Sequence, residues 1–236
     1  MKNSAVRLDN RLRAAAFYMR SCKYAADIGS DHGYLSLFLL ESNPNMRMVV
    51  SDISAESLLK ARVNLKNVSD RAEFIVADGL NAIEKPVECA AICGMGGELI
   101  ARIMESGAER LSGAALVLSP NTEPELVREA VCRIGYHIED EKVACAAGRL
   151  YVIIYAKKGA EECAERDIYI GTKLQLNCDE LTRRYYSWRR EVVKTALDET
   201  SKAVKQNAKR IALYKKRYEW LCEAIERLSK ESGGLA

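Results

Sequence analysis

The sequence lacks several features that would place a protein in a membrane, outside the cell or around a metal. It has only two histidines in 236 residues and no apolar stretch long enough to cross a bilayer. Its first residues lack the apolar core of a signal peptide. We therefore expect a cytoplasmic protein with no membrane partner and no bound metal.

The eight cysteines are scattered and lack the close pairs typical of zinc sites. Cys89 and Cys93 are the closest in sequence, on a strand-like stretch. Four residues of strand span roughly 13 Å, too far for a shared metal or a disulfide. Thiols in a reducing compartment stay reduced, so we predict reduced, structural cysteines.

Lys and Arg exceed Asp and Glu by only 36 to 33, but the cations are concentrated in two zones. Residues 1–26 contain six cations and one acid, and residues 183–217 contain twelve cations and three acids. Two basic zones on an otherwise acidic chain favour a polyanion such as nucleic acid as partner. Long solvated helices that simply tolerate Lys and Arg are the alternative.

From residue 24 to about 157, strand-like stretches alternate with helical patterns, which predicts βαβ units and a parallel sheet. The expected strands are 24–27, 46–52, 73–77, 90–93 and 115–119, and the expected helices are 34–41, 55–67, 96–106 and 123–134. Stretches 136–146 and 150–157 have no room for a helix between them and predict a hairpin. A seven-stranded, mostly parallel sheet with an antiparallel last strand is typical of the class I Rossmann-like methyltransferase fold.

After a polar linker at 159–171, residues 172–232 contain no Gly or Pro. Apolar side chains there follow two heptad-like series that are out of phase, with the slip near Asp198–Ser201. We predict a coiled-coil hairpin with its bend near Asp198–Gln206, and domains at 1–158 and 159–236. One long dimerising helix is the alternative. The two series are Leu181, Tyr185, Trp188, Val192 and Thr195, then Ile211, Tyr214, Tyr218, Leu221, Ile225 and Leu228.

The segment Asp27–Gly33 (DIGSDHG) follows a strand and opens a helix, as a nucleotide-binding turn does. Asp31 stands where a dinucleotide fold has its second glycine, and an acid there is hostile to pyrophosphate but compatible with a sulfonium and an ammonium group. The segment therefore predicts S-adenosylmethionine as cofactor, with the carboxylate at the helix amides and Asp27 near the ammonium. An ordinary glycine turn is the alternative. The candidate cofactor residues of this loop are Asp27, Gly29, Ser30, Asp31, His32 and Gly33.

The ends of the next strands supply further candidates. Asp52 ends the second strand, where an acid can accept both ribose hydroxyls, although it can also cap the following helix. Asp78 and Gly79 follow the third strand and suit the adenine amine, with Ile53 packing on the ring. Gly94-Met95-Gly96-Gly97 follows the fourth strand and leaves space for a flat base. Asn121 follows the fifth strand and either binds a base edge or caps a helix.

Taken together, Arg7-Leu-x-x-Arg11-Leu, the loop Asp27–Leu35, Gly94–Gly97 and Pro120-Asn121 resemble the bacterial tRNA (adenine-22 N1)-methyltransferases (TrmK-like) over essentially the whole chain. Ser119 departs from this pattern, where the family has Gln. The resemblance implies methyl transfer to N1 of an adenosine in the tRNA D-arm, in a protein that needs no oligomer. It implies catalytic roles for Asp31 and the Gly94 carbonyl at the developing positive charge, and Met95, Tyr34 or Asn121 as residues that hold the base.

The resemblance also implies that cationic side chains bind tRNA phosphates. The candidates are Arg7, Arg11, Arg13, Arg183, Arg184, Arg189 and Arg190. Two rival functions remain: a methyltransferase for another RNA or a small molecule, and a non-catalytic RNA-binding protein with a methyltransferase-like shell. Binding of S-adenosylmethionine discriminates between the second rival and an enzyme.

Overall fold

The computed structural model describes residues 6–202 and 207–233. The chain divides into two compact units, Met1–Cys163 and Ala164–Ala236, called here the N-terminal and C-terminal units. None of the helices in the described ranges is long and apolar enough to cross a membrane.

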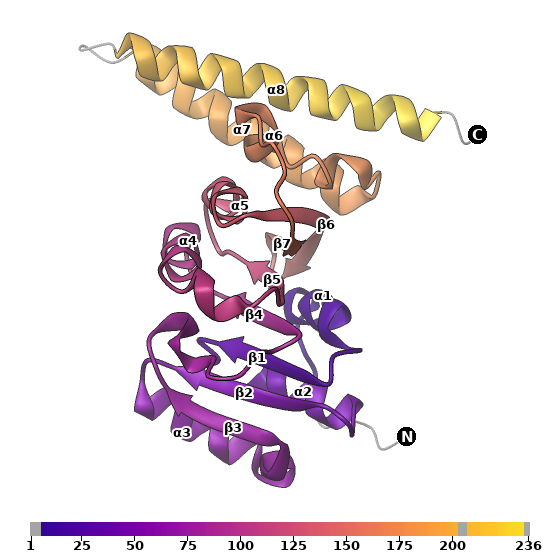
Figure 1. Cartoon of the computed structure of the whole chain (residues 1–236). Helices are drawn as coiled ribbons and strands as arrows, with labels where there is room; N and C mark the ends of the chain where they lie inside the picture. The colour runs from indigo at the N-terminus through magenta and orange to yellow at the C-terminus, as the bar shows by residue number, and fades with distance from the viewer. Residues whose placement is uncertain (1–5, 203–206, 234–236) are drawn as a thin grey trace. The chain divides into compact units, whose positions relative to one another are not determined.

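The N-terminal unit is built on a seven-stranded sheet of order β3-β2-β1-β4-β5-β7-β6 (Figure 1). Strands β1 to β5 pair in parallel, and β7 lies antiparallel between β5 and β6. This order confirms the predicted class I methyltransferase sheet. The strands are β1 (Tyr24–Ile28), β2 (Arg47–Asp52), β3 (Ala72–Val76), β4 (Cys89–Cys93), β5 (Ala115–Ser119), β6 (Tyr136–Ala146) and β7 (Arg149–Lys158).

Helices pack on both faces of this sheet (Figure 1). Neighbouring contacts join α1 to α2 and α2 to α3 on one side, and α4 to α5 on the other. The sequence predicts four of these helices, but α1 was not predicted. The helices are α1 (Asn10–Met19), α2 (Tyr34–Ser42), α3 (Ala55–Asn64), α4 (Gly97–Ser106) and α5 (Pro124–Arg133).

The central strands are short and covered on both faces. In β4 and β5 nearly every residue is buried, including Ala90, Ala91 and Val117. A parallel strand between two helical layers has no polar face, so its sequence is continuously apolar rather than alternating. Because these strands are buried along their length, chemistry is left to the loops at their carboxyl ends.

The β6–β7 hairpin closes the sheet as predicted. Ala147 and Gly148 both have positive φ, 47° and 74°, which is the pattern of a two-residue type I′ turn. A shift in register between Ile138 and Asp140 marks a bulge in β6. The hairpin reverses the chain at the edge where β1 to β5 end, so the start of β7 lies beside the loops that follow the parallel strands.

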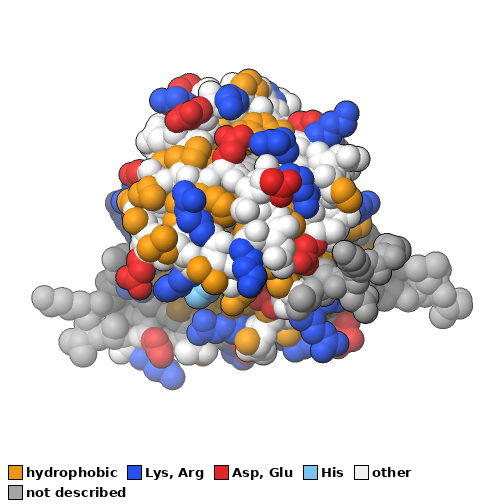
Figure 2. Space-filling model, turned by 90° about the horizontal axis from the view of Figure 1, so that it is seen from below, with side chains coloured by type: hydrophobic (Ala, Val, Ile, Leu, Met, Phe, Trp, Pro, Cys, Tyr) orange, Lys and Arg blue, Asp and Glu red, His pale blue; other side chains and the backbone are white. Residues whose placement is uncertain are grey.

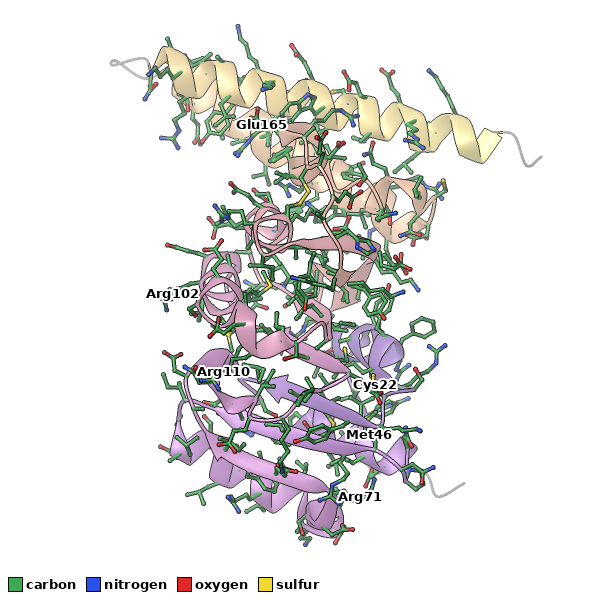
Figure 3. All side chains as sticks on the ribbon, viewed as in Figure 1. Cys22, Met46, Arg71, Arg102, Arg110 and Glu165 are labelled. Carbon is green, nitrogen blue, oxygen red and sulfur yellow. A yellow bond between two sulfur atoms is a disulfide. The ribbon has the colours of Figure 1, made fainter. Side chains whose placement is uncertain are left out.

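The side chain of Arg71 ties two parts of the N-terminal unit together through two hydrogen bonds. The Arg71 guanidinium donates from Nη1 to the carbonyls of Asn43 and Met46, at 3.0 and 3.3 Å (Figure 3).

On α3, the apolar side chains of Leu59 and Val63 are exposed. Figure 2, the view from below, shows apolar side chains interspersed with charged ones rather than gathered into one large patch.

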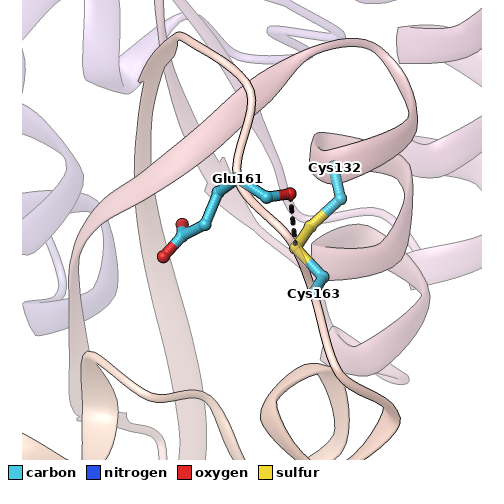
Figure 4. Close-up of a disulfide and its surroundings, with 3 residues drawn as sticks. All are labelled: Cys132, Glu161 and Cys163. Atoms are coloured by element: carbon cyan, nitrogen blue, oxygen red, sulfur yellow. Dashed lines mark hydrogen bonds between the residues drawn. A yellow bond between two sulfur atoms is a disulfide. The ribbon is translucent and has the colours of Figure 1, made fainter.

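Cys132 of α5 and Cys163 form a disulfide (Figure 4). Their Cα atoms are 6.6 Å apart, although 31 positions separate them in sequence. The prediction that all the cysteines are reduced is therefore wrong for this pair. The chain leaves β7 and returns past the end of α5, and spacing along the sequence carries no sign of that return. The other six cysteines are not disulfide-bonded.

The C-terminal unit contains α6 (Glu165–Ile170), α7 (Glu180–Lys202) and α8 (Ala208–Gly233). Within it, α7 and α8 pack against each other and run in opposite directions (Figure 1). The predicted hairpin is confirmed. Helix α7 continues through the predicted slip at Asp198–Ser201, and positions 203–206 of the predicted bend lie outside the described residues. The expected linker 159–171 contains α6, whose Tyr169 and Ile170 are buried.

The predicted seam of α7 is right at Tyr185, which is buried, and wrong at Trp188 and Val192, which are 54% and 51% exposed. Thr182, Tyr186 and Val193, each one position away from a predicted residue, are buried instead. On the buried face of α7, the Tyr186 hydroxyl donates to the Ile170 carbonyl of α6 at 3.0 Å. On α8, Leu221 and Leu228 of the predicted series are buried, together with Ala224.

Candidate active site

The loop after β1 makes a left-handed turn at the carboxyl edge of the sheet. Gly29, Asp31 and Gly33 have φ of 71°, 46° and 70°, a region that glycine favours and Asp tolerates. The Ser30 N–H donates to the Ser51 carbonyl at 2.8 Å, and the Gly33 N–H donates to the Ser30 carbonyl at 2.9 Å. The loop is thereby fixed to β2 and opens directly into α2.

The two glycines of this loop have no room for a side chain. A Cβ on Gly29 would occupy the space of the Met95 terminal methyl group. A Cβ on Gly33 would lie 2.6 Å from Leu65 Cδ1 and 3.1 Å from the Ala61 Cβ. Gly29 therefore allows Met95 to lie over the loop, and Gly33 allows α2 to approach the end of α3.

Asp27 is buried beneath the loop. Its Oδ2 accepts hydrogen bonds from the Ser30 and Ser36 hydroxyls at 2.8 and 2.7 Å. Burial raises the pKa of Asp27, hydrogen bonds from Ser36 and Ser30 oppose that rise, and the charge of Asp52 adds to it. Through these bonds Asp27 holds the loop on the first turn of α2, and its predicted contact with an ammonium group, direct or through water, stays a prediction.

Asp52 joins the same loop to α3. Its Oδ2 accepts from the Asp31 N–H at 3.1 Å, and its Oδ1 accepts from the Ser54 N–H at 2.8 Å. The helix-capping role weighed for this position belongs to Ser54, whose hydroxyl accepts from the Ser57 N–H at 3.2 Å. Asp52 is only half-buried, so its carboxylate retains lone pairs that can accept from a ribose.

Asp31 and His32 form the outer rim of the loop. The His32 Nε2 lies 3.4 Å from Asp31 Oδ2, and the His32 ring stacks on Tyr34 with centroids 5.4 Å apart. Asn64 donates from Nδ2 to the His32 carbonyl at 2.9 Å. Both Asp31 and Tyr34 are exposed, so an acid and an aromatic face stand at the open side of the loop.

The end of β3 lies beside this acid cluster. The Ala77 N–H donates to the Asp52 carbonyl at 3.2 Å, which places Asp78 and Gly79 next to the end of β2. Asp78 is exposed, and Ile53 is 70% exposed despite its apolar side chain. An exposed isoleucine beside exposed acids suits a bound aromatic ring, and the assignment of these residues to adenine remains a prediction.

The loops after β4 and β5 are joined by hydrogen bonds. Asn121 donates from Nδ2 to the Gly94 carbonyl and from its backbone N–H to the Met95 carbonyl, at 2.6 and 2.7 Å. The Gly94 N–H donates to the Ser119 carbonyl at 3.0 Å. The Gly94 carbonyl, proposed as a group that stabilises positive charge, therefore already has one donor. Ser119 is buried, and its hydroxyl has no hydrogen-bond partner among the described residues.

The arginines near the N-terminus differ in environment. Arg7 and Arg13 are exposed, as phosphate-binding side chains must be. The Arg11 side chain is only 16% exposed, and its guanidinium lies 5.4 Å from the Tyr151 ring centroid. Sequence reasoning missed Tyr151 and the helix α1 that positions Arg11; the N-cap residue Asp9 was the only available signal.

The arginines of α7 also differ. Arg184 is exposed, and Arg190 pairs with Glu191 at 2.9 Å. Arg189 lies over the Tyr169 ring at 4.4 Å, so much of its surface contributes to packing. Among the residues that the structure describes, no group of three His, Cys, Asp or Glu is placed to hold a metal ion.

A family model described as a methyltransferase domain matches residues 8–154. The tRNA (adenine(22)-N(1))-methyltransferase of Bacillus subtilis is 31% identical over 163 residues, covering 67% of this chain and 68% of that protein. This chain belongs to the tRNA (adenine(22)-N(1))-methyltransferase family. A putative tRNA methyltransferase of Mycoplasma genitalium is 28% identical over 139 residues, 58% of this chain and 62% of that relative.

Solved structures of the same family have the same fold. The B. subtilis m1A22 tRNA methyltransferase TrmK superposes with a TM-score of 0.85 at 25% identity, over 93% of this chain and 99% of that one. A Streptococcus pneumoniae putative tRNA (m1A22) methyltransferase in complex with S-adenosyl-L-methionine gives 0.81 at 24% identity, over 93% and 100%. The latter similarity speaks for the fold alone.

Proposed function

We propose that this chain transfers a methyl group from S-adenosylmethionine to N1 of adenosine 22 in the tRNA D-arm. The observation that carries the proposal is the ring of loops at the carboxyl edge of the sheet. Asp52 links the β1 loop to β2, Asn121 links the β4 loop to β5, and Met95 crosses from one pair to the other. In open α/β sheets this edge is where ligands bind.

The residues of this edge fit S-adenosylmethionine. The bound cofactor would supply an electrophilic methyl group on a sulfonium. Asp52 is placed to accept from the ribose, and Asp78 and Ile53 to hold the adenine. Asp31 adds a negative charge at the open side, which favours a cationic cofactor and excludes a pyrophosphate. The glycines on either side of Met95 leave room for a flat base.

Methyl transfer to N1 depends more on the position of the adenine than on a side chain that accepts a proton. N1 of adenine is already a nucleophile with an available lone pair, so holding it in line with the methyl group provides most of the acceleration. The methylated base becomes cationic, and Asp31 stabilises that charge as it develops. Tyr34, Met95 and Asn121 are the candidates to hold a base that has left its helical stack.

We further infer that tRNA is bound through exposed cations, in the cytoplasm where tRNA is found. Arg7, Arg13 and the basic side chains of α7 are the candidates, because phosphate contacts need exposed guanidinium groups. The Cys132–Cys163 disulfide is uncommon in a reducing compartment. Alkylating thiols in intact cells, followed by mass spectrometry, would show whether this pair is oxidised where the protein works.

The decisive experiment is methylation of two tRNA transcripts that differ only at position 22, adenosine or guanosine, followed by nucleoside mass spectrometry. We expect 1-methyladenosine from the first transcript alone. Methylation of both would indicate another target. Calorimetric titration with S-adenosylmethionine separates the remaining rival, because a protein that binds tRNA but not the cofactor would be a non-catalytic RNA-binding protein.

A further inference from the structure

Arg11 is held at the carboxyl edge of the sheet by the start of α1. Asp9 caps this helix, its Oδ1 accepting from the Leu12 N–H at 2.7 Å. Asn10 donates from Nδ2 to the Cys145 carbonyl at 3.1 Å, near the end of β6. The first turn of α1 therefore lies where the parallel strands end, and Arg11 points from this turn toward the β4 loop.

The Arg11 guanidinium lies against Gly94. A Cβ on Gly94 would be 3.3 Å from Arg11 Nη1, and Tyr151 flanks the other side. Nη1 is fully buried and has no hydrogen-bond partner among the described residues. The Asp9 carboxylate is 3.9 Å from Nε, at the outer limit of an ion pair. A buried, charged donor without an acceptor is costly, so this geometry indicates that a ligand supplies one.

The acids of the neighbouring loops restrict which group of the cofactor Arg11 can bind. Asp27, Asp31 and Asp52 are acids that suit the ammonium, sulfonium and ribose of the cofactor, but not its carboxylate. The first amides of α2 are partly occupied, because the Gly33 N–H donates to the Ser30 carbonyl and the Ser36 N–H donates to Asp27. A further donor would therefore complete the binding of the carboxylate.

Arg11 lies against the β4 loop, and the same loop contacts the β1 loop that would hold the methionine part. The pKa of Cys93, the last residue of β4, is affected by both Asp27 and Arg11. Burial raises this pKa to about 12, the negative charge of Asp27 adds to the rise, and the positive charge of Arg11 opposes it. Met95, the neighbour of Gly94, covers Gly29 with its methyl group. Arg11, Gly94, Met95 and Gly29 thus form one continuous wall.

We propose that Arg11 binds the carboxylate of the methionine part of S-adenosylmethionine, rather than a tRNA phosphate. This assignment rests on the proposed function. A guanidinium matches a carboxylate with two parallel hydrogen bonds, which gives it specificity as well as charge. The phosphates of a folded RNA are reached by exposed side chains such as Arg7 and Arg13, whereas the Arg11 side chain is only 16% exposed and lies against the β4 loop.

The test compares two ligands that differ only in the carboxylate: S-adenosylmethionine and its decarboxylated form. Calorimetry gives the affinity of each for the wild-type protein and for Arg11→Met. We expect Arg11→Met to weaken S-adenosylmethionine about 10- to 100-fold, and the decarboxylated form less than about twofold. Arg11→Lys keeps the positive charge but cannot donate two parallel hydrogen bonds. We therefore expect a smaller loss of affinity, again only for the ligand that has the carboxylate.

Arg20→Met is the matched control, since Arg20 is an exposed arginine at the other end of the same helix and should leave both affinities unchanged. Equal losses for both ligands, or no loss for either, would overturn the assignment. If Arg11→Met lowered the affinity for tRNA and left the affinity for S-adenosylmethionine intact, Arg11 would instead be a residue that binds tRNA phosphates. If the wild-type protein bound neither ligand, the proposed function itself would fail. Circular dichroism of each variant shows that it is folded.

Discussion

The two units of this protein use arginine in opposite ways. In the N-terminal unit, Arg128 is completely buried, and its Nε donates to the equally buried Glu141 at 2.7 Å. In the C-terminal unit, Arg189 and Arg217 lie over the ring of Tyr169, at 4.4 and 4.6 Å, on long helices rich in exposed cations. The buried Arg128–Glu141 pair makes the first unit sensitive to the loss of one partner, whereas the long helices of the second unit carry a high density of positive charge. Stability and cofactor binding should therefore be sensitive to single changes in the first unit, and tRNA binding to summed charge in the second.

The largest effect is expected from Arg128→Ala. Removing one partner leaves the Glu141 carboxylate buried without its ion pair, at a cost of about 3–5 kcal/mol in the free energy of unfolding. Urea unfolding followed by circular dichroism measures the loss. Arg133→Ala on the same helix is the control: Arg133 is 53% exposed, and its pairs with Glu105 and Glu129 contribute at most about 1 kcal/mol.

The same variant tests whether the units are energetically separate. Both tryptophans, Trp188 and Trp220, belong to the C-terminal unit, so their fluorescence follows that unit alone. If the units unfold independently, Arg128→Ala shifts the circular dichroism transition and leaves the fluorescence transition in place. A common shift of both signals would show that the two units unfold as one.

Asp52→Ala is expected to weaken S-adenosylmethionine binding by roughly 1–3 kcal/mol, because it removes hydrogen bonds from a charged acceptor. It also frees the Asp31 N–H, so part of the loss comes from the loop. Calorimetry measures the change, and tRNA affinity should stay constant. Glu56→Ala, an exposed acid on α3, is the control. Unaltered cofactor affinity in Asp52→Ala would remove this residue from the site.

Neutralising three arginines of α7 tests the other half of the comparison. Arg183, Arg184 and Arg190 changed to Gln should weaken tRNA binding about tenfold and flatten its salt dependence, since fewer counterions are released. Arg189 is kept because it packs on Tyr169. The control neutralises three exposed lysines of the N-terminal unit, Lys60, Lys66 and Lys85. An equal change of salt slope in both triple variants would contradict a special role for α7.

The smallest effect concerns pH. The raised pKa of buried Asp27 means that the folded state holds this proton more tightly, so its contribution to stability is present below about pH 3.9 and is lost as the pH rises through the folded pKa. Glu139 has the opposite sign: hydrogen bonds from Lys157 and then His137 lower its pKa, so its contribution is lost as the pH falls. Asp27→Asn should remove the first dependence. Glu139→Gln should remove the second, which is much weaker because the Glu139 side chain is exposed to solvent. Urea stability between pH 3 and 8 distinguishes them, and unchanged slopes would refute both signs.

By itself, the sequence determined the features that depend on neighbours along the chain. Alternating stretches located all seven strands within a few residues, because a buried parallel strand and an amphipathic helix have different periodicities. The Ala147–Gly148 turn marked the closing hairpin. The glycines and acids of Asp27–Gly33 marked the candidate cofactor loop, because a turn with positive φ at the end of a strand needs those residues locally.

Only the tertiary structure decided features that depend on a partner far away in sequence. The Cys132–Cys163 disulfide joins positions that no spacing rule connects. The buried face of α7 departs from the heptad series at Tyr186, whose hydroxyl donates to the Ile170 carbonyl of α6. Arg11 belongs to a basic zone in the sequence, yet α1 places its guanidinium beside Gly94, where the side chain is only 16% exposed. Composition records which charges a chain carries, whereas burial, which depends on all the elements packed around a side chain, decides which of those charges stay exposed to solvent and which lie between loops.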